Sequence, residues 1–515
     1  MRFSRRITQC LVLFLIHAAS VQAREFRVLP YLQNPDQSAM TVRWLSETNT
    51  PGMLTVVTPD GPVEFRSQPS RARTLAYNPV RKEPGGPHGD VPWMHSIRVD
   101  HLKPGTKYHY SVTQGAETHT AEFRTAPTSD QAVRLIVYSD SETEPESSTL
   151  PPVDWPESTG SNRPPGVTQY LADQTAGYRA NCQVMLERQP DLILLVGDLV
   201  ETGGEQRDWD EFWKHNAGEF GSLASHIPIV ASLGNHESYA GPGGGHSAAG
   251  ANFGTGKFRT YFESPDNGAS DPKHQGRYFR MDYGPVTILS VDSTDGLPHQ
   301  TPSDTNFSLV GSDAPDFNPG SEQYRWLEEQ LADAQRNSRF TFVQFHHTMF
   351  GSGMHSVPFS HQDFAGHSGI AMRVLLPLLM KHGVDAVFSG HDEMLERSVV
   401  RGRETLPDGV SRFHSIHCYD VGIGGDGLRG PAVGFDNPYR EFLAHENFPE
   451  IWDGSTLVSG GKHYGHLEVN VMPDAEGVWR IDIVPVHVFP VIDRDGNIKV
   501  WERRLFPDTV IITQP

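Results

Sequence analysis

The sequence predicts an N-terminal all-β sandwich followed by a larger α/β layered domain. Short runs in which apolar and polar residues alternate, separated by turn residues, occupy most of residues 24–127. From Val133 onward, apolar strands end in small polar clusters and alternate with helical patterns. Gly (49) and Pro (39) are abundant among the 515 residues, which indicates many turns and long loops rather than a helical bundle.

Residues 1–23 have the pattern of a signal peptide. Three arginines lie within the first six residues, the apolar run 10–16 follows, and Ala23 supplies a small residue at the cleavage position. The apolar run is far shorter than the ~20 residues of a membrane span, which argues against the alternative of a membrane anchor. We therefore expect a protein that is exported, to the periplasm or the medium, after cleavage near Ala23, and that has no membrane span.

Charge and cysteine content exclude several kinds of site. The chain has 43 Lys and Arg against 63 Asp and Glu, and its net charge of −20 would repel a nucleic-acid backbone. The expected mature protein contains two cysteines, Cys182 and Cys418, which either form one disulfide or remain as buried thiols. The sequence contains no Cys-x-x-Cys, so a thiolate zinc site is excluded.

Residues 24–127 predict the β-sandwich. Met40, Val42 and Trp44 alternate with polar neighbours, which is typical of a half-buried strand. Further strands are expected at 54–57, 94–99, 108–112 and 121–125. The segments 30–34 (PYLQN) and 41–44 (TVRW) resemble the fibronectin-III-type domain that precedes some phosphatases. No residue of the sandwich suggests chemistry, so we expect a packing or adhesion module.

Residues 128–515 predict the α/β layered domain with a C-terminal extension. Strands are expected at 133–137, 192–195, 229–230, 340–345 and 386–388. Helices are expected near 175–187, from Gly320-Ser321 onward, and near 370–381. Polar residues follow each strand, and α/β folds place their sites at strand ends.

Five polar clusters follow these strands in one order. They are Asp140-x-Glu142, Gly197-Asp198, Gly234-Asn235-His236-Glu237, His346-His347 and Gly390-His391-Asp392-Glu393. Each alone is a common turn or loop, but the set resembles the calcineurin-like metallophosphoesterase family, and with the sandwich in front it resembles the purple acid phosphatases. The resemblance covers nearly all of residues 26–470. It implies a four-layer αββα domain and a metal-dependent phosphoric ester hydrolase of the acid phosphatase or phosphodiesterase type.

The resemblance also implies roles for individual residues. Two metal ions would support attack of a metal-activated hydroxide on a phosphate mono- or diester. Asp198 would bridge the ions, and Asn235, His346 and His391 would complete a second site for Mn, Fe or Zn. His236 binds no metal in the family pattern, and it would stabilise the transition state or protonate the leaving oxygen.

Two positions depart from the family pattern at the first metal site. Glu142 stands where the family has His or Gly, and Glu393 stands where it has the second His of the last motif. Because both replacements are carboxylates, they favour a rebuilt first site of Asp140, Glu142, Asp198 and Glu393 for a hard ion such as Mn, Mg, Ca or Fe. The alternative is a binding protein that has lost the first metal and keeps one site. Glu201 replaces the Tyr of purple enzymes, so the tyrosinate-to-iron colour is not expected.

Other candidates lie outside the five clusters. His355 lies nine residues after His346, a spacing similar to that of a substrate-contacting His in purple acid phosphatases, but it could equally belong to a His-bearing surface loop. The long segments 143–168 and 240–256 adjoin the motifs, and they are expected either to shape substrate access or to be disordered. His463 and His466 have no assigned place at the metals.

Overall fold

The computed structural model describes residues 25–77, 91–149, 151–241, 248–294, 314–358, 361 and 367–514. The predicted signal peptide therefore lies outside the described residues. No helix in the described part of the chain is both long enough and apolar enough to cross a bilayer.

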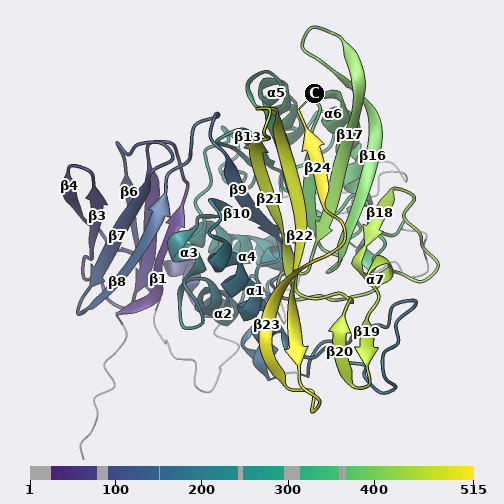
Figure 1. Cartoon of the computed structure of the whole chain (residues 1–515). Coiled ribbons are helices and arrows are strands. Elements are labelled where there is room, and N and C mark those ends of the chain that lie inside the picture. The colour runs from purple at the N-terminus through teal and green to yellow at the C-terminus, as the bar shows by residue number, and fades with distance from the viewer. Residues whose placement is uncertain are drawn as a thin grey trace, which may run out of the picture.

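Two four-stranded antiparallel sheets form the N-terminal sandwich, seen on the left of Figure 1. One sheet contains β1 (Phe26–Gln33), β2 (Met40–Ser46), β6 (Trp93–Val99) and β5 (Ser70–Arg71). The other contains β4 (Gly61–Arg66), β3 (Met53–Thr58), β7 (Lys107–Gln114) and β8 (Glu117–Arg124). The inward residues of both sheets, among them Trp44 and Tyr108, form one core, and the predicted all-β fold of this domain is confirmed.

Two seven-stranded sheets face each other in the larger domain (Figure 1). The first contains β11 (Ile229–Ser232), β10 (Leu192–Val196), β9 (Val133–Tyr138), β21 (Gly465–Pro473), β22 (Trp479–Ile492) and β23 (Ile498–Leu505), with β24 (Val510–Thr513) paired to β22. The second contains β12 (Phe279–Tyr283), β13 (Val286–Ser290), β14 (Phe340–His347), β15 (Ala386–Gly390), β17 (Ser411–Val421), β16 (Leu395–Thr405) and β18 (Arg440–Leu443). A separate small hairpin contains β19 (Ile451–Asp453) and β20 (Thr456–Ser459).

Helices cover the outer face of each sheet. The first sheet is covered by α1 (Gln174–Arg188), α2 (Gln206–Ala217), α3 (Leu223–His226) and α4 (Ala248–Tyr261). The second is covered by α5 (Glu322–Asn337) and α6 (Leu376–Lys381). Along β9, Leu135 and Val137 enter the core between the sheets, whereas Ile136 and Tyr138 pack toward the helices. Strands buried on both faces explain the continuous apolar runs, and the predicted αββα layering is confirmed.

Two element predictions need correction. The segment 240–256 is predicted to be a loop, and its residues 242–247 lie outside the described residues. From Ala248 onward it forms α4, which includes three of its glycines, and one of these, Gly254, packs against backbone where a side chain would not fit. The expected helix near 370–381 is a 3-10 helix (Gly369–Leu375) followed by the short α6, which has a proline in its first turn.

The segment 143–168 is packed rather than loose over its described residues. It contains one 3-10 turn (Pro145–Ser148), and further along the chain Trp155 is 1% exposed. The guanidinium of Arg163 forms a buried ion pair with Glu450 and lies 4.0 Å from the centre of the Trp155 ring. This segment is therefore fixed against the C-terminal part of the chain, and the alternative of disorder is not realised for it.

The two cysteines are buried free thiols. Cys182 lies in α1 and packs among the helices over the first sheet, whereas Cys418 lies in β17 and packs over the second sheet. Because the two sheets separate them, the disulfide alternative is not realised.

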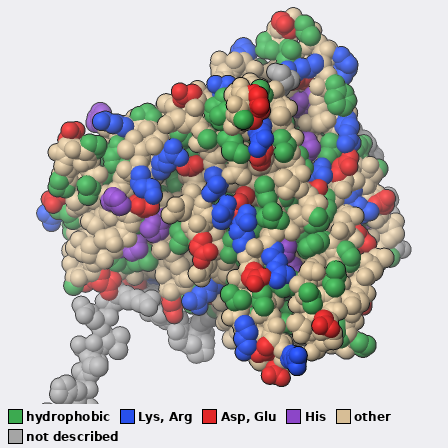
Figure 2. Space-filling view, viewed as in Figure 1, with side chains coloured by type: hydrophobic (Ala, Val, Ile, Leu, Met, Phe, Trp, Pro, Cys, Tyr) green, Lys and Arg blue, Asp and Glu red, His purple; other side chains and the backbone are tan. Residues whose placement is uncertain are grey.

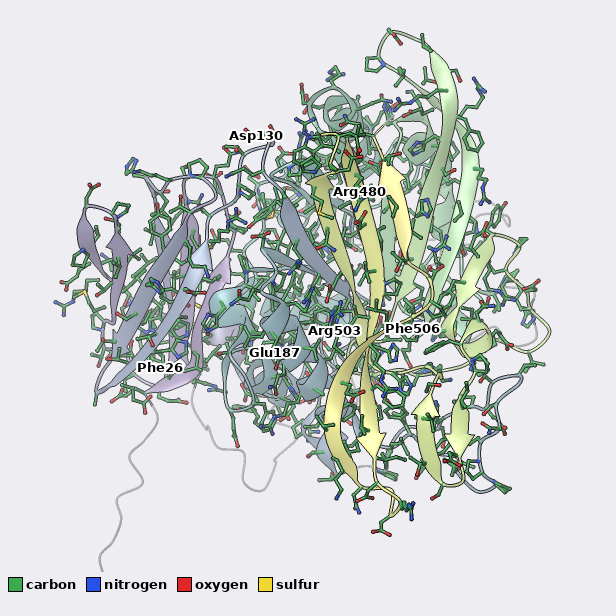
Figure 3. The ribbon with its side chains drawn as sticks, viewed as in Figure 1. Phe26, Asp130, Glu187, Arg480, Arg503 and Phe506 are labelled. Atoms are coloured by element: carbon green, nitrogen blue, oxygen red, sulfur yellow. The ribbon has the colours of Figure 1, made fainter. Side chains whose placement is uncertain are left out.

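The C-terminal strands belong to the main core. Phe506, labelled in Figure 3, is 1% exposed and packs its ring against Phe442 and Phe448. The C-terminal extension therefore completes the first sheet.

On this face of the molecule, Figure 2 shows acidic and basic side chains interspersed rather than gathered by sign.

Parallel pairing brings the predicted polar clusters together. Strands β9, β10 and β11 run parallel, and so do β13, β14, β15 and β17. Their carboxyl ends therefore lie at one edge of each sheet, where ligand sites of α/β folds occur.

Candidate metal centre

The candidate site lies at the carboxyl ends of the parallel strands. Asp140 and Asp198 follow β9 and β10 by two residues each, and Asn235 and His236 follow β11. From the second sheet, His346 is the second-to-last residue of strand β14, and His391 directly follows β15. Both sheets therefore contribute side chains to one site.

The backbone at this site is in an unusual conformation. Five of the predicted ligands have positive φ angles: Asp140 (57°), Glu142 (32°), Asp198 (50°), His391 (83°) and Glu393 (49°). A residue other than glycine in this region costs of the order of 1–3 kcal/mol, and such residues cluster at functional sites. The surrounding packing holds these side chains in directions that an unstrained strand end would not give.

The glycines before the ligands make room for neighbouring ligands. A Cβ added to Gly234 would lie 2.1 Å from Oδ1 of Asp198. Gly197 has a φ of +87°, and a Cβ there would lie 2.6 Å from Nδ1 of His346. The repeated pattern of glycine followed by a polar residue is therefore a requirement of close packing between the ligand loops.

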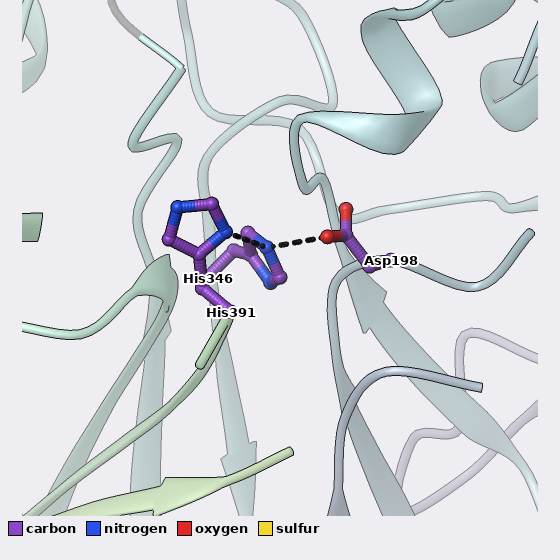
Figure 4. Close-up of side chains that lie close together, drawn as sticks. All are labelled: Asp198, His346 and His391. Carbon is purple, nitrogen blue, oxygen red and sulfur yellow. Dashed lines mark hydrogen bonds and ion pairs between the residues drawn. The ribbon is translucent and has the colours of Figure 1, made fainter. Parts of the chain in front are cut away.

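Asp198, His346 and His391 form one group, which we call the imidazole cluster (Figure 4). His346 Nε2 lies 2.8 Å from Asp198 Oδ2, 3.1 Å from Asn235 Oδ1 and 3.2 Å from His391 Nδ1. The other nitrogen of each ring is engaged elsewhere: His346 Nδ1 donates to the Val196 carbonyl at 2.9 Å, and His391 Nε2 donates to the His367 carbonyl at 2.8 Å. In the neutral rings, these bonds fix the tautomers that leave lone pairs on His346 Nε2 and His391 Nδ1.

Charge within the imidazole cluster shifts its protonation. Burial lowers the pKa of His346, but the carboxylates of Asp198 and Asp140 outweigh burial and raise that pKa to about 9. Burial would raise the pKa of Asp198, but His346 and His236 bring it well below its usual range. Burial and the neighbouring His355 and His347 rings lower the pKa of His391 far below its ordinary value, so its ring is neutral, as a metal ligand must be.

Glu142, Glu393 and Asp426 form a second group, which we call the carboxylate cluster. Their exposed fractions are 3%, 4% and 8%. Burial, followed by the charge of Asp426, raises the pKa of both Glu142 and Glu393 well above the ordinary value. Arg429 contacts Glu393 through its guanidinium, and its side chain is half exposed. With one arginine contact for three buried carboxylates, the ionised forms are unfavourable, which agrees with the raised pKa values.

His236 lies between the two clusters. It forms a third group of possible metal-binding atoms with Glu142 and Asp198, and its Nε2 is 3.5 Å from Glu142 Oε1. Its Nδ1 donates to the Glu201 carbonyl at 2.6 Å, so Nε2 is the nitrogen that faces the site. Burial lowers the pKa of His236, but Asp198 and Glu201 raise it to about 8.

Asp140 is placed differently from the other predicted ligands. Both of its oxygens accept the backbone N–H of His391 at 3.1 Å, and it is fully buried. Within the described residues, it belongs to none of the three groups of possible metal-binding atoms. Burial and the nearby Asp198 charge, opposed by His346, raise its pKa to about 7. Its role as a ligand stays a prediction.

Sequence reasoning missed two residues of the site. Asp426 follows β17 in a glycine-rich segment, and the rule that polar residues follow parallel strands would have found it. Glu237 was part of a predicted motif without an assigned role. Its buried carboxylate accepts the backbone N–H groups of Asp198, Leu199 and Gly234 at 3.0, 2.8 and 2.8 Å, so it holds the loop that carries Asp198.

The remaining histidine candidates divide into two groups. The His355 ring lies 4.3 Å from the His391 ring, and its backbone N–H donates to Asp392, so it is beside the imidazole cluster. His463 bonds to the hydroxyl of Tyr170, and His466 bonds to Asn181, both at 2.7 Å. Both of the latter are buried in other parts of the core and have local structural partners.

The donor set fits metal ions. In the imidazole cluster, two oriented ring nitrogens and the oxygens of Asp198 and Asn235 converge within hydrogen-bond distance, a donor set that could bind a cation in place of the shared proton. In the carboxylate cluster, three buried carboxylates gather beside the Arg429 contact, and a bound cation would stabilise their ionised forms. Mixed nitrogen and oxygen donors suit borderline divalent ions, whereas oxygen-only donors suit hard ions.

Two family patterns match this chain. The calcineurin-like phosphoesterase pattern matches residues 172–392, and the purple acid phosphatase N-terminal domain matches residues 27–125.

Sequence relatives agree with this division. An uncharacterized protein of Mycobacterium tuberculosis is 28% identical over 315 residues, which is 59% of this chain and 51% of that protein. A protein of Arabidopsis thaliana named probable inactive purple acid phosphatase 24 is 22% identical over 70% of this chain and 53% of its own length. Probable purple acid phosphatase 20 of the same plant is 24% identical over 76% and 75%. The chain spans about half the length of the first two of these relatives.

Solved structures show the same fold. Purple acid phosphatase PPD1 from yellow lupin has a TM-score of 0.59 at 17% identity, covering 94% of this chain and 74% of that one. The structure of PhoD has a TM-score of 0.59 at 12% identity, covering 96% and 92%. With the two family patterns, which cover residues 27–125 and 172–392, the chain combines a purple acid phosphatase N-terminal domain with a calcineurin-like phosphoesterase domain.

Proposed function

We propose that this protein is an exported phosphoesterase that uses two metal ions to hydrolyse phosphate mono- or diesters. One ion is assigned to Asp198, Asn235, His346 and His391, and it is a borderline divalent ion such as Mn, Fe or Zn. The other is assigned to the oxygen ligands Glu142, Asp198, Glu393 and Asp426, with Asp140 adjoining, and it is a hard ion such as Mn, Mg, Ca or Fe. Bound ions supply the charge that polarises the phosphoryl group and activates water.

One observation carries this proposal. Asp198 belongs both to the imidazole cluster and to the group that contains Glu142 and His236, so its carboxylate lies within reach of both donor sets. Oδ2 faces His346, and Oδ1 accepts the backbone N–H of His236 at 2.9 Å. A carboxylate held in this way is suited to bridge two cations.

His236 is suited to transfer a proton to the leaving oxygen. Its Nδ1–H is held by the Glu201 carbonyl, which aims Nε2 toward the site. Because its pKa is raised to about 8, the ring carries a proton at neutral pH. His355, beside the His391 ring, is proposed to contact the substrate phosphate.

A second candidate function is a binding protein that retains one metal ion without turnover. It is favoured by the two glutamates at positions where the family has histidines, and by relatives that are named probable inactive. The two functions predict different metal contents: two ions per chain for the enzyme and one for the binding protein.

The test is hydrolysis of p-nitrophenyl phosphate and bis(p-nitrophenyl) phosphate by the exported, processed chain, purified without chelator and assayed with Mn, Mg, Ca or Zn. We expect metal-dependent turnover and two ions per chain by elemental analysis. His236→Ala should lose turnover and keep both ions, since the residue is assigned to proton transfer and not to coordination. One ion per chain with no turnover under any metal would establish the binding protein instead.

A further inference from the structure

Glu237 binds the backbone of the loop that carries Asp198. The Glu237 carboxylate accepts three backbone N–H groups, those of Asp198, Leu199 and Gly234, and it is fully buried. The position of Asp198 therefore depends on where the Glu237 backbone lies. Glu237 belongs to a single 3-10 turn (His236–Ser238), which is too short to fix itself.

The Glu237 backbone is pressed between two glycines. A Cβ on Gly203 would lie 2.5 Å from the Glu237 carbonyl oxygen, and a Cβ on Gly254 of α4 would lie 2.3 Å from the same atom. Both distances are shorter than any real contact of this kind, so α4 packs backbone to backbone on the 3-10 turn. A shift of α4 would therefore displace the Glu237 backbone.

The N-terminal sandwich holds α4 through Lys257, one helical turn beyond Gly254. Lys257 is fully buried, and its Nζ donates to the carbonyls of Thr74 and Ala76 of the sandwich at 2.9 and 2.8 Å. The third donor reaches Oε1 of Gln206 in α2 at 3.2 Å. In Figure 1, α2, α3 and α4 lie together on the side of the larger domain that faces the sandwich, with α3 next to it.

A buried ammonium is a costly way to join two domains. Taking a charge out of water is unfavourable unless every donor is satisfied. A buried methionine or leucine at this position would hold the two domains together equally well. All three Lys257 donors are satisfied, two of them by backbone carbonyls whose positions the sandwich fixes. Lys257 therefore sets a defined position for α4, which a nonpolar contact would not do.

We propose that Lys257 is a positioning residue through which the N-terminal sandwich sets the Glu237 backbone and so the placement of Asp198. The sandwich then helps to position a metal ligand and is not only a packing or adhesion module. This inference rests on the proposed function only in taking Asp198 as a metal ligand, and metal binding tests it without reference to turnover.

The test compares two interface variants in the full chain. Lys257→Met removes the link to α4 and keeps the side-chain length. Tyr110→Phe is the matched control, because the buried Tyr110 hydroxyl donates to the Ser225 carbonyl at 2.7 Å and so joins the sandwich to α3, away from Glu237. The measurements are Mn²⁺ binding by titration calorimetry, kcat and KM for p-nitrophenyl phosphate, and thermal unfolding.

Lys257→Met should bind Mn²⁺ roughly 10-fold more weakly and lower kcat with KM unchanged, because the ligand shell is displaced while the substrate contacts remain. Tyr110→Phe should lower the unfolding temperature and leave Mn²⁺ affinity and kcat as in the wild type. Wild-type metal affinity in a folded Lys257→Met, or equal losses of metal affinity in both variants, would overturn the proposal.

A second variant keeps the proposal testable if Lys257→Met does not fold. Gly254→Ala acts at the other end of the same link, where its Cβ would displace the Glu237 carbonyl. We expect weaker Mn²⁺ binding in this variant with the Lys257 contacts intact. Unchanged Mn²⁺ affinity in Gly254→Ala would also overturn the proposal. If the wild type binds Mn²⁺ but hydrolyses no phosphate ester, the proposed function fails while the metal-affinity comparison still decides this inference.

Discussion

The imidazole cluster and the carboxylate cluster lie at the same edge of the sheets but use different donors. The first combines two ring nitrogens with one carboxylate, Asp198, and the second has three carboxylates and one half-exposed arginine, Arg429. Because ring nitrogens are neutral ligands and carboxylates are charged and hard, we expect the two clusters to prefer different ions. The comparison indicates that side chains at the strand ends can vary the donor type while the scaffold stays the same.

The largest effect is expected from the residue that the two donor sets share. Asp198→Asn replaces a charged bridge by a neutral amide, so both ions should be held more weakly and hydrolysis should fall by more than ~100-fold. The measurement is kcat together with metal content of the purified variant. A near wild-type rate would contradict the dinuclear site, and circular dichroism would check that the fold is intact.

The double variant Glu142→His with Glu393→His should make the two clusters alike. It removes two negative charges and introduces softer donors, so the metal preference should shift by roughly 10-fold or more from Mn and Mg toward Zn. Metal-to-protein ratios and the metal dependence of hydrolysis measure this. Glu142→Ala and Glu393→Ala are the comparison variants. Each should weaken binding of the ion at the carboxylate cluster and leave the ion at the imidazole cluster bound. Wild-type protein with one ion, and both Ala variants unchanged, would rule out the rebuilt site.

Asp426→Asn tests whether the carboxylate cluster includes the residue that sequence reasoning missed. It should weaken the harder ion by about 10-fold and leave the ion of the imidazole cluster bound, because Asp426 is near only Glu142 and Glu393 in these groups. Titration with Mn²⁺ and Ca²⁺ measures the effect. Asp436→Asn is the matched control, since its side chain is 77% exposed and the charge change is the same. Equal effects of the two variants would mean that Asp426 acts only through its charge at long range and does not bind the ion.

The smallest effect on the metals is expected from a buried carboxylate that protein cations neutralise. Glu468 accepts from Arg188 Nε at 2.9 Å and from Arg503 Nε at 2.8 Å. Burial would raise the pKa of Glu468, but His466, Arg503 and Arg188 bring it far below its ordinary value. Such a group stabilises the fold above its unfolded pKa of ~4.3, and this contribution is lost as the pH falls through the folded value.

Glu468→Gln should therefore lower the free energy of unfolding by about 1–3 kcal/mol at pH 7 and by less as the pH approaches the folded pKa. Denaturant titrations at pH 7 and pH 4 measure the difference, and metal content should not change. A change in metal content would contradict the separation of Glu468 from the metal centre.

Much of the fold was predictable because its signals are local. Apolar runs such as Leu192–Val196 that end in a polar cluster indicate strands buried on both faces with a site at their carboxyl ends, and the layered fold is confirmed. The helix from Ser321 was predictable because a capping serine precedes an apolar stripe, and the serine hydroxyl does accept the N–H of Tyr324. The order of the motifs identified Asp198, His346 and His391 as candidates. Their assignment as ligands stays a prediction.

Local patterns in the sequence identify the kind of each element and the residues at its end. Which ends meet depends on tertiary packing: Asp426, about 230 residues beyond Asp198, lies with Glu142 and Glu393, and Asp140 accepts the His391 backbone N–H. Tertiary packing also decides that the two cysteines are separated by the sheets and that a buried lysine joins the sandwich to α4. These contacts depend on packing between segments far apart in the chain, and periodicity reports only the faces of one segment at a time.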